Sequence, residues 1–184
     1  MTSAAGNRLL IDATRRELAA AADPVRAPQQ QAYMKSAMPY RGLTSPELRR
    51  VMRRLLSDPS LRPANADEWE STIRALWDEA THREEWYAAL VIARHPTAIA
   101  HRELGALPLY RHLVVTAAWW DVVDEVATHL VRDELLADRD RVAPTMRSWA
   151  AAPDQWVRRT AILCQIGARD SVDVALLRDV IVPN

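Results

Sequence analysis

The sequence predicts an all-α protein. Apolar residues recur at helical spacing along most of the 184 residues, and the alternation that is typical of strands is missing. The chain holds only four glycines and no phenylalanine. Alanine, leucine and arginine abound, and these residues lose little conformational entropy in a helix. Short linkers between medium-length helices fit either a helical bundle or an α-solenoid.

Weak repetition decides between these two architectures. Trp69 and Trp86, and later Trp149 and Trp156, each lie near the start of a predicted helix. Repeats of roughly 40 residues that consist of two helices are often this degenerate in sequence. We therefore favour an α-solenoid of antiparallel helix pairs, with residues 1–184 as a single domain.

Helix boundaries follow from prolines and capping residues. The first helix ends before Pro24, and the second stops at Pro39. The third has a hydroxyl cap at Thr44, with Pro46 and an acid in its first turn, and it closes before Pro59. Apolar spacing predicts the later helices. The expected helices cover residues 7–22, 27–37, 44–56, 66–79, 82–94, 97–115, a stretch that begins at Trp119, and residues 134–151, 154–168 and 171–180.

The charge of the chain gives no general support for nucleic-acid binding. The formal net charge is zero, so such a role would need a local cluster of arginines. All but one of the basic residues are arginine, the exception being Lys35. This bias fits phosphate recognition by guanidinium groups, and it fits, more simply, the codon usage of a GC-rich genome.

Several classes of protein can be set aside. Cys164 is the single cysteine, which indicates a reducing interior and a small core residue rather than a nucleophile. Asp12 and Arg15 interrupt the apolar N-terminal segment, and no membrane span occurs, so we expect a cytoplasmic protein. The histidines show no zinc spacing and no glycine-rich phosphate loop is present. We expect neither a metal nor a cofactor.

The stretch from Trp119 to Asp124 is the most informative part of the chain. On a helical wheel, Trp119 shares an apolar stripe with the valines that follow it, whereas Trp120 lies at the edge of that stripe. Trp120 and Asp124 are four residues apart and so share one face. An aromatic plane beside a carboxylate suits a flat cationic ligand. The pattern also fits a partly buried tryptophan beside a solvated or capping aspartate.

Two arginines follow on the helix expected over residues 154–168. Its packed side contains Trp156 and Thr160, while Arg158 points away and Arg159 lies on the flank. Either arginine could contact a phosphate group or be solvated. The spacing alone leaves both interpretations open.

Five segments occur in an order that is typical of one known family. They are Gln31-Ala32-Tyr33-Met34-Lys35-Ser36-Ala37-Met38-Pro39-Tyr40-Arg41-Gly42, Pro46-Glu47-Leu48-Arg49, Ala75-Leu76-Trp77, the Trp119-to-Asp124 motif and Arg159-Thr160-Ala161-Ile162-Leu163. Together they resemble the DNA alkylation repair enzymes of the AlkD type, which are HEAT-like-repeat DNA glycosylases. The resemblance extends from about residue 30 to the end of the chain, and the Trp-Trp-Asp-x-Val-Asp element is its most specific part.

The resemblance implies a HEAT-like α-solenoid whose concave face holds duplex DNA. Members of this family hydrolyse the N-glycosidic bond of purines alkylated at the 3- or 7-position, with the lesion still stacked. Asp124 falls on the family's catalytic aspartate, Trp120 on an aromatic residue beside the lesion, and Arg159 on an arginine that contacts DNA. Lys35 and Arg158 are further candidates for DNA binding. The alternative function is a HEAT-like module that binds DNA or protein without catalysis.

The C-terminal end departs from the family pattern. Members of the family generally continue with another helical pair, whereas this sequence stops at Asn184. The last predicted helix contains several apolar residues, among them Val174, Leu176 and Val180. We therefore expect an exposed apolar face and self-association through the last repeat.

Overall fold

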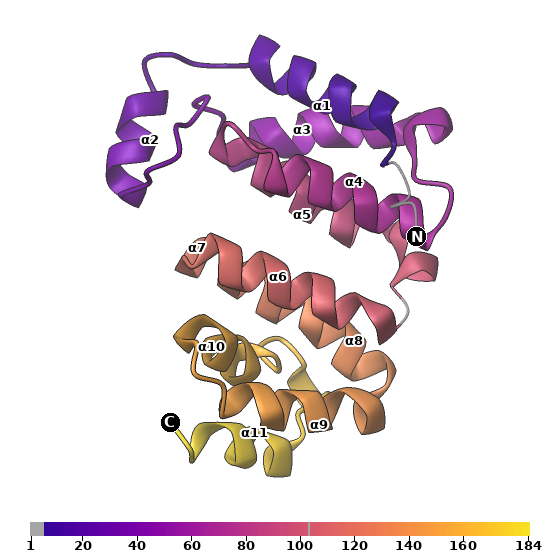
Figure 1. Ribbon diagram of the computed structural model, residues 1–184, viewed down its shortest axis with the longest axis vertical. Coiled ribbons are helices and arrows are strands. Elements are labelled where there is room, and N and C mark those ends of the chain that lie inside the picture. Colours follow the sequence, from indigo (N-terminus) through magenta and orange to yellow (C-terminus); the bar gives the residue numbers. More distant parts are fainter. Residues whose placement is uncertain (1–5, 103) are drawn as a thin grey trace. The chain divides into compact units, whose positions relative to one another are not determined.

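The computed structural model describes residues 6–102 and 104–184 (Figure 1). Every regular element in these residues is helical, and they contain no strand. The prediction of an all-α protein is therefore confirmed. The chain forms two compact units, and the division falls between His101 and Arg102. The assignment of residues 1–184 to a single domain stays a prediction.

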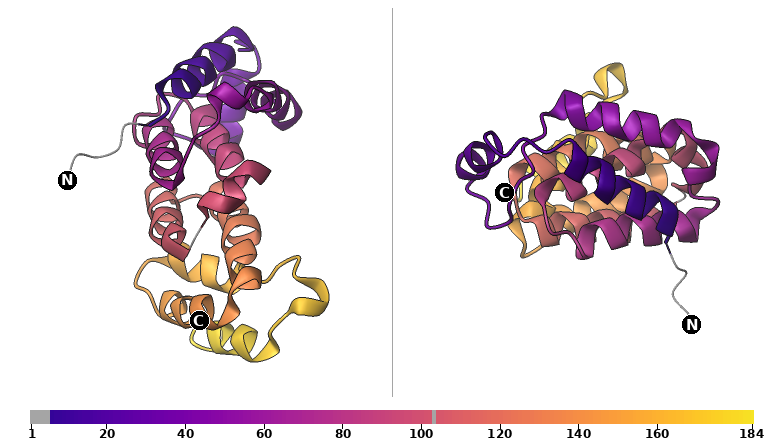
Figure 2. Two further views of the ribbon diagram at one scale, coloured as in Figure 1. Left: turned by 90° about the vertical axis from the view of Figure 1, so that its right-hand side faces the viewer. Right: turned by 90° about the horizontal axis from the view of Figure 1, so that it is seen from above.

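The first unit is made of helices packed in pairs. Its elements, in order, are α1 (Arg8–Ala20), α2 (Ala27–Met34), α3 (Ser45–Ser57), the 3₁₀ helix η1 (Pro59–Leu61), α4 (Ala66–Asp78), α5 (Arg83–Arg94) and the 3₁₀ helix η2 (Pro96–His101). Helix α4 packs along α5, and α1 packs against α3 (Figure 1 and Figure 2). Trp69, Leu76 and Ile92 are buried between them and stabilise the unit by removing apolar surface from water.

The capping residue predicted at Thr44 is present. The Thr44 hydroxyl accepts a hydrogen bond from the Glu47 backbone N–H, and the Glu47 carboxylate accepts one from the Thr44 backbone N–H at 2.7 Å. Arg26 donates to the same carboxylate at 2.7 Å. The backbone bond from Thr44, followed by the bond from Arg26, lowers the pKa of Glu47 to about 2. The start of α3 is thus fixed by a capping box and an ion pair.

Buried acids at the start of α5 fix the loop that leads into α3. The Glu84 carboxylate accepts hydrogen bonds from the backbone N–H groups of Arg41, Gly42 and Leu43 at 2.9, 2.9 and 3.2 Å. Gly42 has a φ of 92°, and a Cβ atom there would lie 2.2 Å from the Asp23 carbonyl oxygen. This position therefore requires glycine, because both the conformation and the space exclude a side chain.

The neighbouring acid, Glu85, is the centre of a charge network. Its side chain is fully buried and accepts hydrogen bonds from Arg15 at 3.1 Å and from Arg41 at 3.2 Å. The Thr81 hydroxyl donates a third bond at 2.9 Å. Because the network joins α1, the loop before α3 and α5, it ties the first unit together.

The second unit contains the remaining helices. Its elements are the 3₁₀ helix η3 (Leu104–Ala106), α6 (Leu107–Ala117), α7 (Trp120–Glu125), the π-helical segment η4 (Val126–Val131), α8 (Arg132–Ala137), α9 (Arg139–Ala150), α10 (Gln155–Leu163), the 3₁₀ helix η5 (Arg169–Ser171) and α11 (Val174–Ile181). Helix α10 packs against α9, α7 and α6, and α11 packs against α9. The described helices thus continue the pattern of packed pairs.

The π-helical segment follows from the spacing of apolar residues. An ideal α-helix turns about 40° past a full turn every four residues, so residues spaced by four drift around it. A wider π-helical turn corrects such drift. Buried pairs repeat at this spacing along the continuous helix from α7 to α8, namely Val122 and Val123, Val126 and Ala127, Leu130 and Val131, and Glu134 and Leu135.

Several predicted helices have different boundaries in the structure. Helix α2 ends at Met34 rather than at residue 37, and α10 ends at Leu163 rather than at residue 168. The helix expected over residues 97–115 is replaced by η2, η3 and α6, and its residue 103 lies outside the described residues. The boundary expected at residue 134 is wrong, because the helix continues to Ala137. The Asp138 side chain then accepts a hydrogen bond from the Arg141 N–H and starts α9. A cap therefore overrides the continuous helical spacing at this point.

A second buried acid lies in this unit. Glu134 is 5% exposed and accepts a hydrogen bond from the Tyr110 hydroxyl at 3.4 Å. Burial raises the pKa of Glu134 to about 7 and also raises that of Tyr110. Arg102, which partly offsets the effect on Glu134, forms an ion pair with Asp133 at 3.3 Å.

Helix α11 buries more of its apolar residues than the sequence suggests. Leu176 and Val180 are fully buried against the preceding helices, whereas Val174, Ile181 and Val182 are 73%, 47% and 74% exposed. Self-association through this end stays a prediction. Among the described residues, no helix is both long enough and apolar enough to span a membrane.

Candidate functional site

A tight turn between α6 and α7 separates the two adjacent tryptophans. Ala118 ends α6 in the left-handed conformation, with a φ of 46°, and Trp119 is extended and precedes the first turn of α7. The Trp119 side chain is partly buried, and its Nε1 atom is enclosed without a hydrogen-bond partner in the described part of the chain. Trp120 then begins α7. The turn therefore directs the two indoles into different surroundings.

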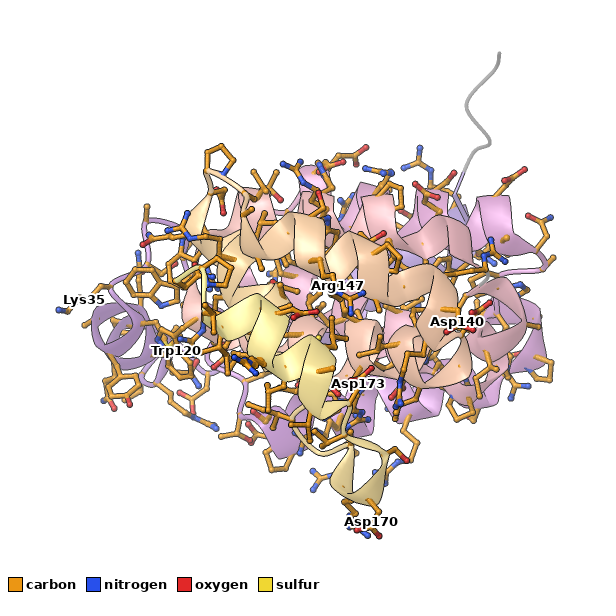
Figure 3. The ribbon with its side chains drawn as sticks, turned by 90° about the horizontal axis from the view of Figure 1, so that it is seen from below. Lys35, Trp120, Asp140, Arg147, Asp170 and Asp173 are labelled. Atoms are coloured by element: carbon orange, nitrogen blue, oxygen red, sulfur yellow. The ribbon has the colours of Figure 1, made fainter. Side chains whose placement is uncertain are left out.

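Trp120 presents its ring to solvent. It is 47% exposed, whereas Trp69, Trp77 and Trp149 are buried. Figure 3 shows its side chain at the edge of the second unit. The exposed part of this ring offers a flat aromatic surface that a ligand can contact. The position at the edge of the core agrees with the helical wheel.

The structure brings Asp124 and Arg159 together. The Arg159 Nε and Nη2 atoms donate to the two carboxylate oxygens of Asp124 at 2.6 and 2.8 Å. The side chains are 33% and 42% exposed for Asp124 and Arg159. These hydrogen bonds raise the pKa of the Arg159 guanidinium. This bidentate geometry fixes the orientation of both groups and keeps them within reach of solvent.

Packing of α7 against α10 explains this pairing. The Asp154 side chain caps α10 by accepting from the N–H groups of Trp156 and Val157, and Val157 is buried. Arg159 lies two residues further on, on the flank predicted from the sequence. The Thr128 hydroxyl donates to the Asp124 carbonyl oxygen at 2.7 Å, at the point where the π-helical segment follows α7. Asp124 and Arg159 thus lie on helical turns that additional hydrogen bonds hold in place.

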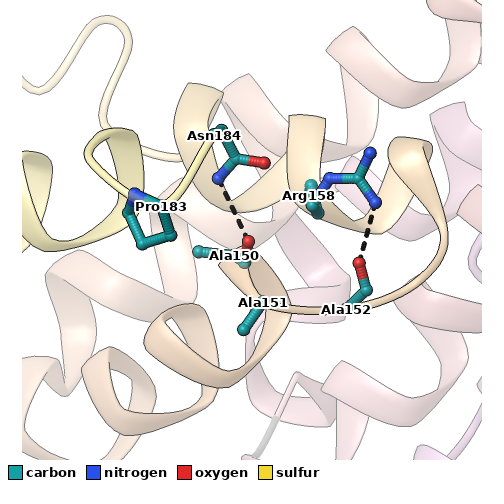
Figure 4. Close-up of a pocket in the computed structure, with 6 residues that line it drawn as sticks. All are labelled: Ala150, Ala151, Ala152, Arg158, Pro183 and Asn184. Atoms are coloured by element: carbon teal, nitrogen blue, oxygen red, sulfur yellow. Dashed lines mark hydrogen bonds between the residues drawn. The ribbon is translucent and has the colours of Figure 1, made fainter.

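The other two predicted DNA-binding residues lie elsewhere. Arg158 donates through one nitrogen to the carbonyl oxygens of Ala152 and Pro153, both at 2.8 Å, beside a shallow pocket (Figure 4). This contact closes the turn between α9 and α10. Lys35 belongs to the first unit, where it is exposed and ends α2 with a φ of 49°. Their assignment to DNA binding stays a prediction.

Other chemistry finds little support at this site. In residues 6–102 and 104–184, no group of three or more His, Cys, Asp or Glu side chains could hold a metal ion. Cys164 is buried, and burial raises the pKa of its thiol to about 12. The thiol therefore stays protonated near neutral pH and fits a core role rather than nucleophilic chemistry.

The sequence does not predict the ion pair between Asp124 and Arg159. Asp124 and Arg159 are separated by 35 residues, and no periodicity connects them. The available signal was that each lies on the flank of its helix, at the edge of an apolar face. Glu134 was missed for a different reason, because an acid in the middle of a helix ordinarily faces water.

Comparisons with known proteins converge on one family. A family model described as "DNA alkylation repair enzyme" matches residues 14–184. No curated protein matches the sequence. Among solved structures, the chain is similar to one described as "Predicted DNA alkylation repair enzyme from Enterococcus faecalis", with 25% sequence identity and a TM-score of 0.74. That similarity covers 88% of this chain and 73% of the other.

Proposed function

Because the chain belongs to the DNA alkylation repair enzyme family, we propose that it is a DNA glycosylase for cationic purines in duplex DNA. Its substrates are purines alkylated at the 3- or 7-position, which carry a formal positive charge. The observation that carries this proposal is the exposed Trp120 ring one helical turn before a carboxylate that Arg159 holds in a bidentate ion pair.

The two side chains on α7 have complementary roles. The face of an indole attracts a cation by about 0.5–2 kcal/mol, so Trp120 favours the charged lesion over a normal purine. Asp124 supplies negative charge near the sugar. Positive charge moves from the base to C1′ of the deoxyribose as the glycosidic bond lengthens, and a fixed carboxylate stabilises that charge.

The reaction needs no acid to protonate the base. As the bond from C1′ to N9 breaks, its electron pair stays on the alkylated purine, which leaves as a neutral molecule. The oxygen of a water molecule forms the new bond to C1′, and one proton of that water passes to the surrounding solvent. Asp124 orients this water through hydrogen bonds. The products are the free base and an abasic sugar.

Arg159 links DNA binding to the exposure of the carboxylate. Its Nη1 atom makes no hydrogen bond to any residue that the structure describes, so a phosphate group can first bind there, before it displaces Asp124 from Nε and Nη2. A phosphate competes with the carboxylate for the same guanidinium. As the phosphate takes over these bonds, the Asp124 oxygens become available to the sugar and the water.

Release of free base from methylated duplex DNA tests this function. We expect Asp124→Asn to slow single-turnover release by about 100- to 1,000-fold, the loss typical of one preorganised electrostatic group. Asp121→Asn, on the preceding turn of the same helix, is the matched control and should lose much less. Equal losses in the two variants would contradict the role of Asp124. Binding of methylated DNA without any base release by the unmodified chain would instead support the non-catalytic module.

A second variant separates lesion recognition from chemistry. We expect Trp120→Leu to weaken binding of methylated duplex relative to undamaged duplex, because leucine offers no aromatic face to a cation. Discrimination between the two duplexes should fall by up to about 30-fold, which corresponds to about 2 kcal/mol. Unchanged discrimination would place the lesion elsewhere.

A further inference from the structure

The outer face of α3 carries arginines that the proposed excision site does not use. Arg49, Arg50 and Arg53 are exposed. In the described part of the chain, their side chains form no ion pair and no hydrogen bond. At about 100° per residue, these three positions share an arc of about 100° that points away from the buried Leu48 and Met52. We call these three residues the α3 basic face.

Neighbouring charges do not neutralise this face. Arg54 of α3 and Arg16 of α1 both pair with one carboxylate, that of Glu17. Glu47, at the start of α3, pairs with Arg26. Asp12 of α1 is exposed but forms no ion pair with any described arginine. Positive charge is therefore in local excess in a chain whose net charge is zero.

Most other described arginines are already engaged. Arg62 and Arg158 donate to carbonyl oxygens that end helices or close turns, and Arg83 stacks on the Trp86 ring at 4.7 Å. The α3 basic face differs because three neighbouring guanidinium groups are left without partners. Arginines that form ion pairs elsewhere include Arg15, Arg26, Arg41, Arg74, Arg102, Arg132, Arg147 and Arg159.

We propose that the α3 basic face binds the phosphate backbone of duplex DNA, as a contact separate from base excision. Guanidinium groups match phosphate oxygens in charge and geometry. Arg49 and Arg53 are one helical turn apart, about 6 Å, which allows contact with different phosphates of one strand. The same arc otherwise presents Pro46 and Ser57, so it carries no carboxylate that would repel a phosphate group.

Salt titration of binding to undamaged duplex DNA tests this contact. We expect the triple variant R49Q/R50Q/R53Q to lower the slope of log affinity against log salt by about 2 to 3, since each phosphate contact contributes about 0.9. Affinity in 0.1 M salt should fall on the order of 100-fold. The DNA carries no lesion, so this contact and the proposed excision activity can fail separately.

Two control variants keep the test specific. R8Q/R111Q/R178Q removes the same charge from three exposed arginines on separate helices, α1, α6 and α11, and should change the slope much less. R49K/R50K/R53K keeps the charge and should keep most of the slope. If the salt slope falls equally in both glutamine variants, the effect depends only on net charge and the proposal is overturned. An unchanged slope in R49Q/R50Q/R53Q, or equal competition by polyglutamate and duplex DNA, would also overturn it.

Discussion

The two units each place an acid between helices, but the two acids are held in opposite ways. In the first unit, Glu85 is fully buried and accepts hydrogen bonds from Arg15, Arg41 and Thr81. In the second unit, the Asp124 carboxylate has one bidentate partner, Arg159, and about a third of its side chain surface remains exposed. Both are carboxylate–arginine contacts, yet only the second is open to a ligand.

This difference separates a structural network from a candidate site. A buried charge is tolerated only when several partners compensate its lost hydration, and such a group has no capacity left for a ligand. An exposed ion pair contributes little to stability and can exchange one partner for another. The surroundings of a carboxylate, rather than its contact with an arginine, therefore indicate its role.

The largest effect is expected for Glu85→Gln. Loss of this charge leaves two arginines near a neutral buried group, and breaking a buried pair typically costs about 3–5 kcal/mol. Denaturant unfolding of the variant should show this loss. Glu79→Gln is the matched control, because Glu79 is exposed and pairs with the same Arg15 at 3.3 Å. Similar free energies of unfolding for the two variants would contradict the structural role assigned to the buried Glu85.

Glu134 sharpens the comparison, because it is a buried acid that accepts a hydrogen bond from the neutral Tyr110 hydroxyl. Its pKa is raised from the ordinary 4.5 to about 7, so the folded state favours the protonated form. The stability from this group is complete below pH 4.5 and is lost as the pH rises through 7, by at most about 3 kcal/mol. Glu134→Gln should abolish this part of the pH dependence. Unfolding curves at pH 5 and pH 8 that differ equally in both proteins would contradict the assignment.

A smaller effect is expected for Arg159→Ala. The loss of one phosphate contact should weaken binding to methylated and undamaged duplex alike, by about tenfold or 1.4 kcal/mol, and lower the salt slope by about one. Arg159→Lys should keep the slope but not the bidentate geometry. Filter binding over a salt series measures both quantities. If Arg159→Ala changes neither, the arginine serves only to hold Asp124.

The smallest effect is expected for the stability of Asp124→Asn. An exposed ion pair contributes about 0–1 kcal/mol, so the variant should unfold within 1 kcal/mol of the unmodified protein. This result, together with slow base release, would separate function from folding. A loss as large as that expected for Glu85→Gln would instead make the Asp124–Arg159 pair part of the structural framework.

Much of the fold could be predicted from local sequence signals. The capping box at Thr44 gave the start of α3, and Pro59 gave its end, whereas α2 ends at Met34, well before Pro39. Local sequence signals did not predict the helix boundaries that depend on tertiary or capping contacts. Asp138 interrupts a continuous helical pattern by capping α9, and the helix expected over residues 97–115 breaks before α6, near Gly105 and Pro108. Such boundaries depend on competition between caps and helix propagation, which spacing alone does not rank.

The exposed face of α7 was predictable from the sequence, whereas the contacts of Asp124 were not. Trp120 and Asp124 are four residues apart on one helix, and this spacing predicts that they share a face of α7. The bidentate contact with Arg159 depends on how α7 packs against α10, and this packing leaves no trace in either segment alone. Arg158 closes a turn by contacts with carbonyl oxygens five and six residues before it, which helical spacing does not describe.

The π-helical segment after Asp124 has a consequence for protein engineering. It contains, in effect, one residue more than a regular helix with the same buried face would need. A designed copy in which an ideal α-helix replaces this segment would therefore rotate Asp124 by about 100° relative to the buried residues of α8, such as Leu135. Deleting one residue between Val126 and Val131 would do the same in the natural chain. A designer must copy the irregular turn along with the acid.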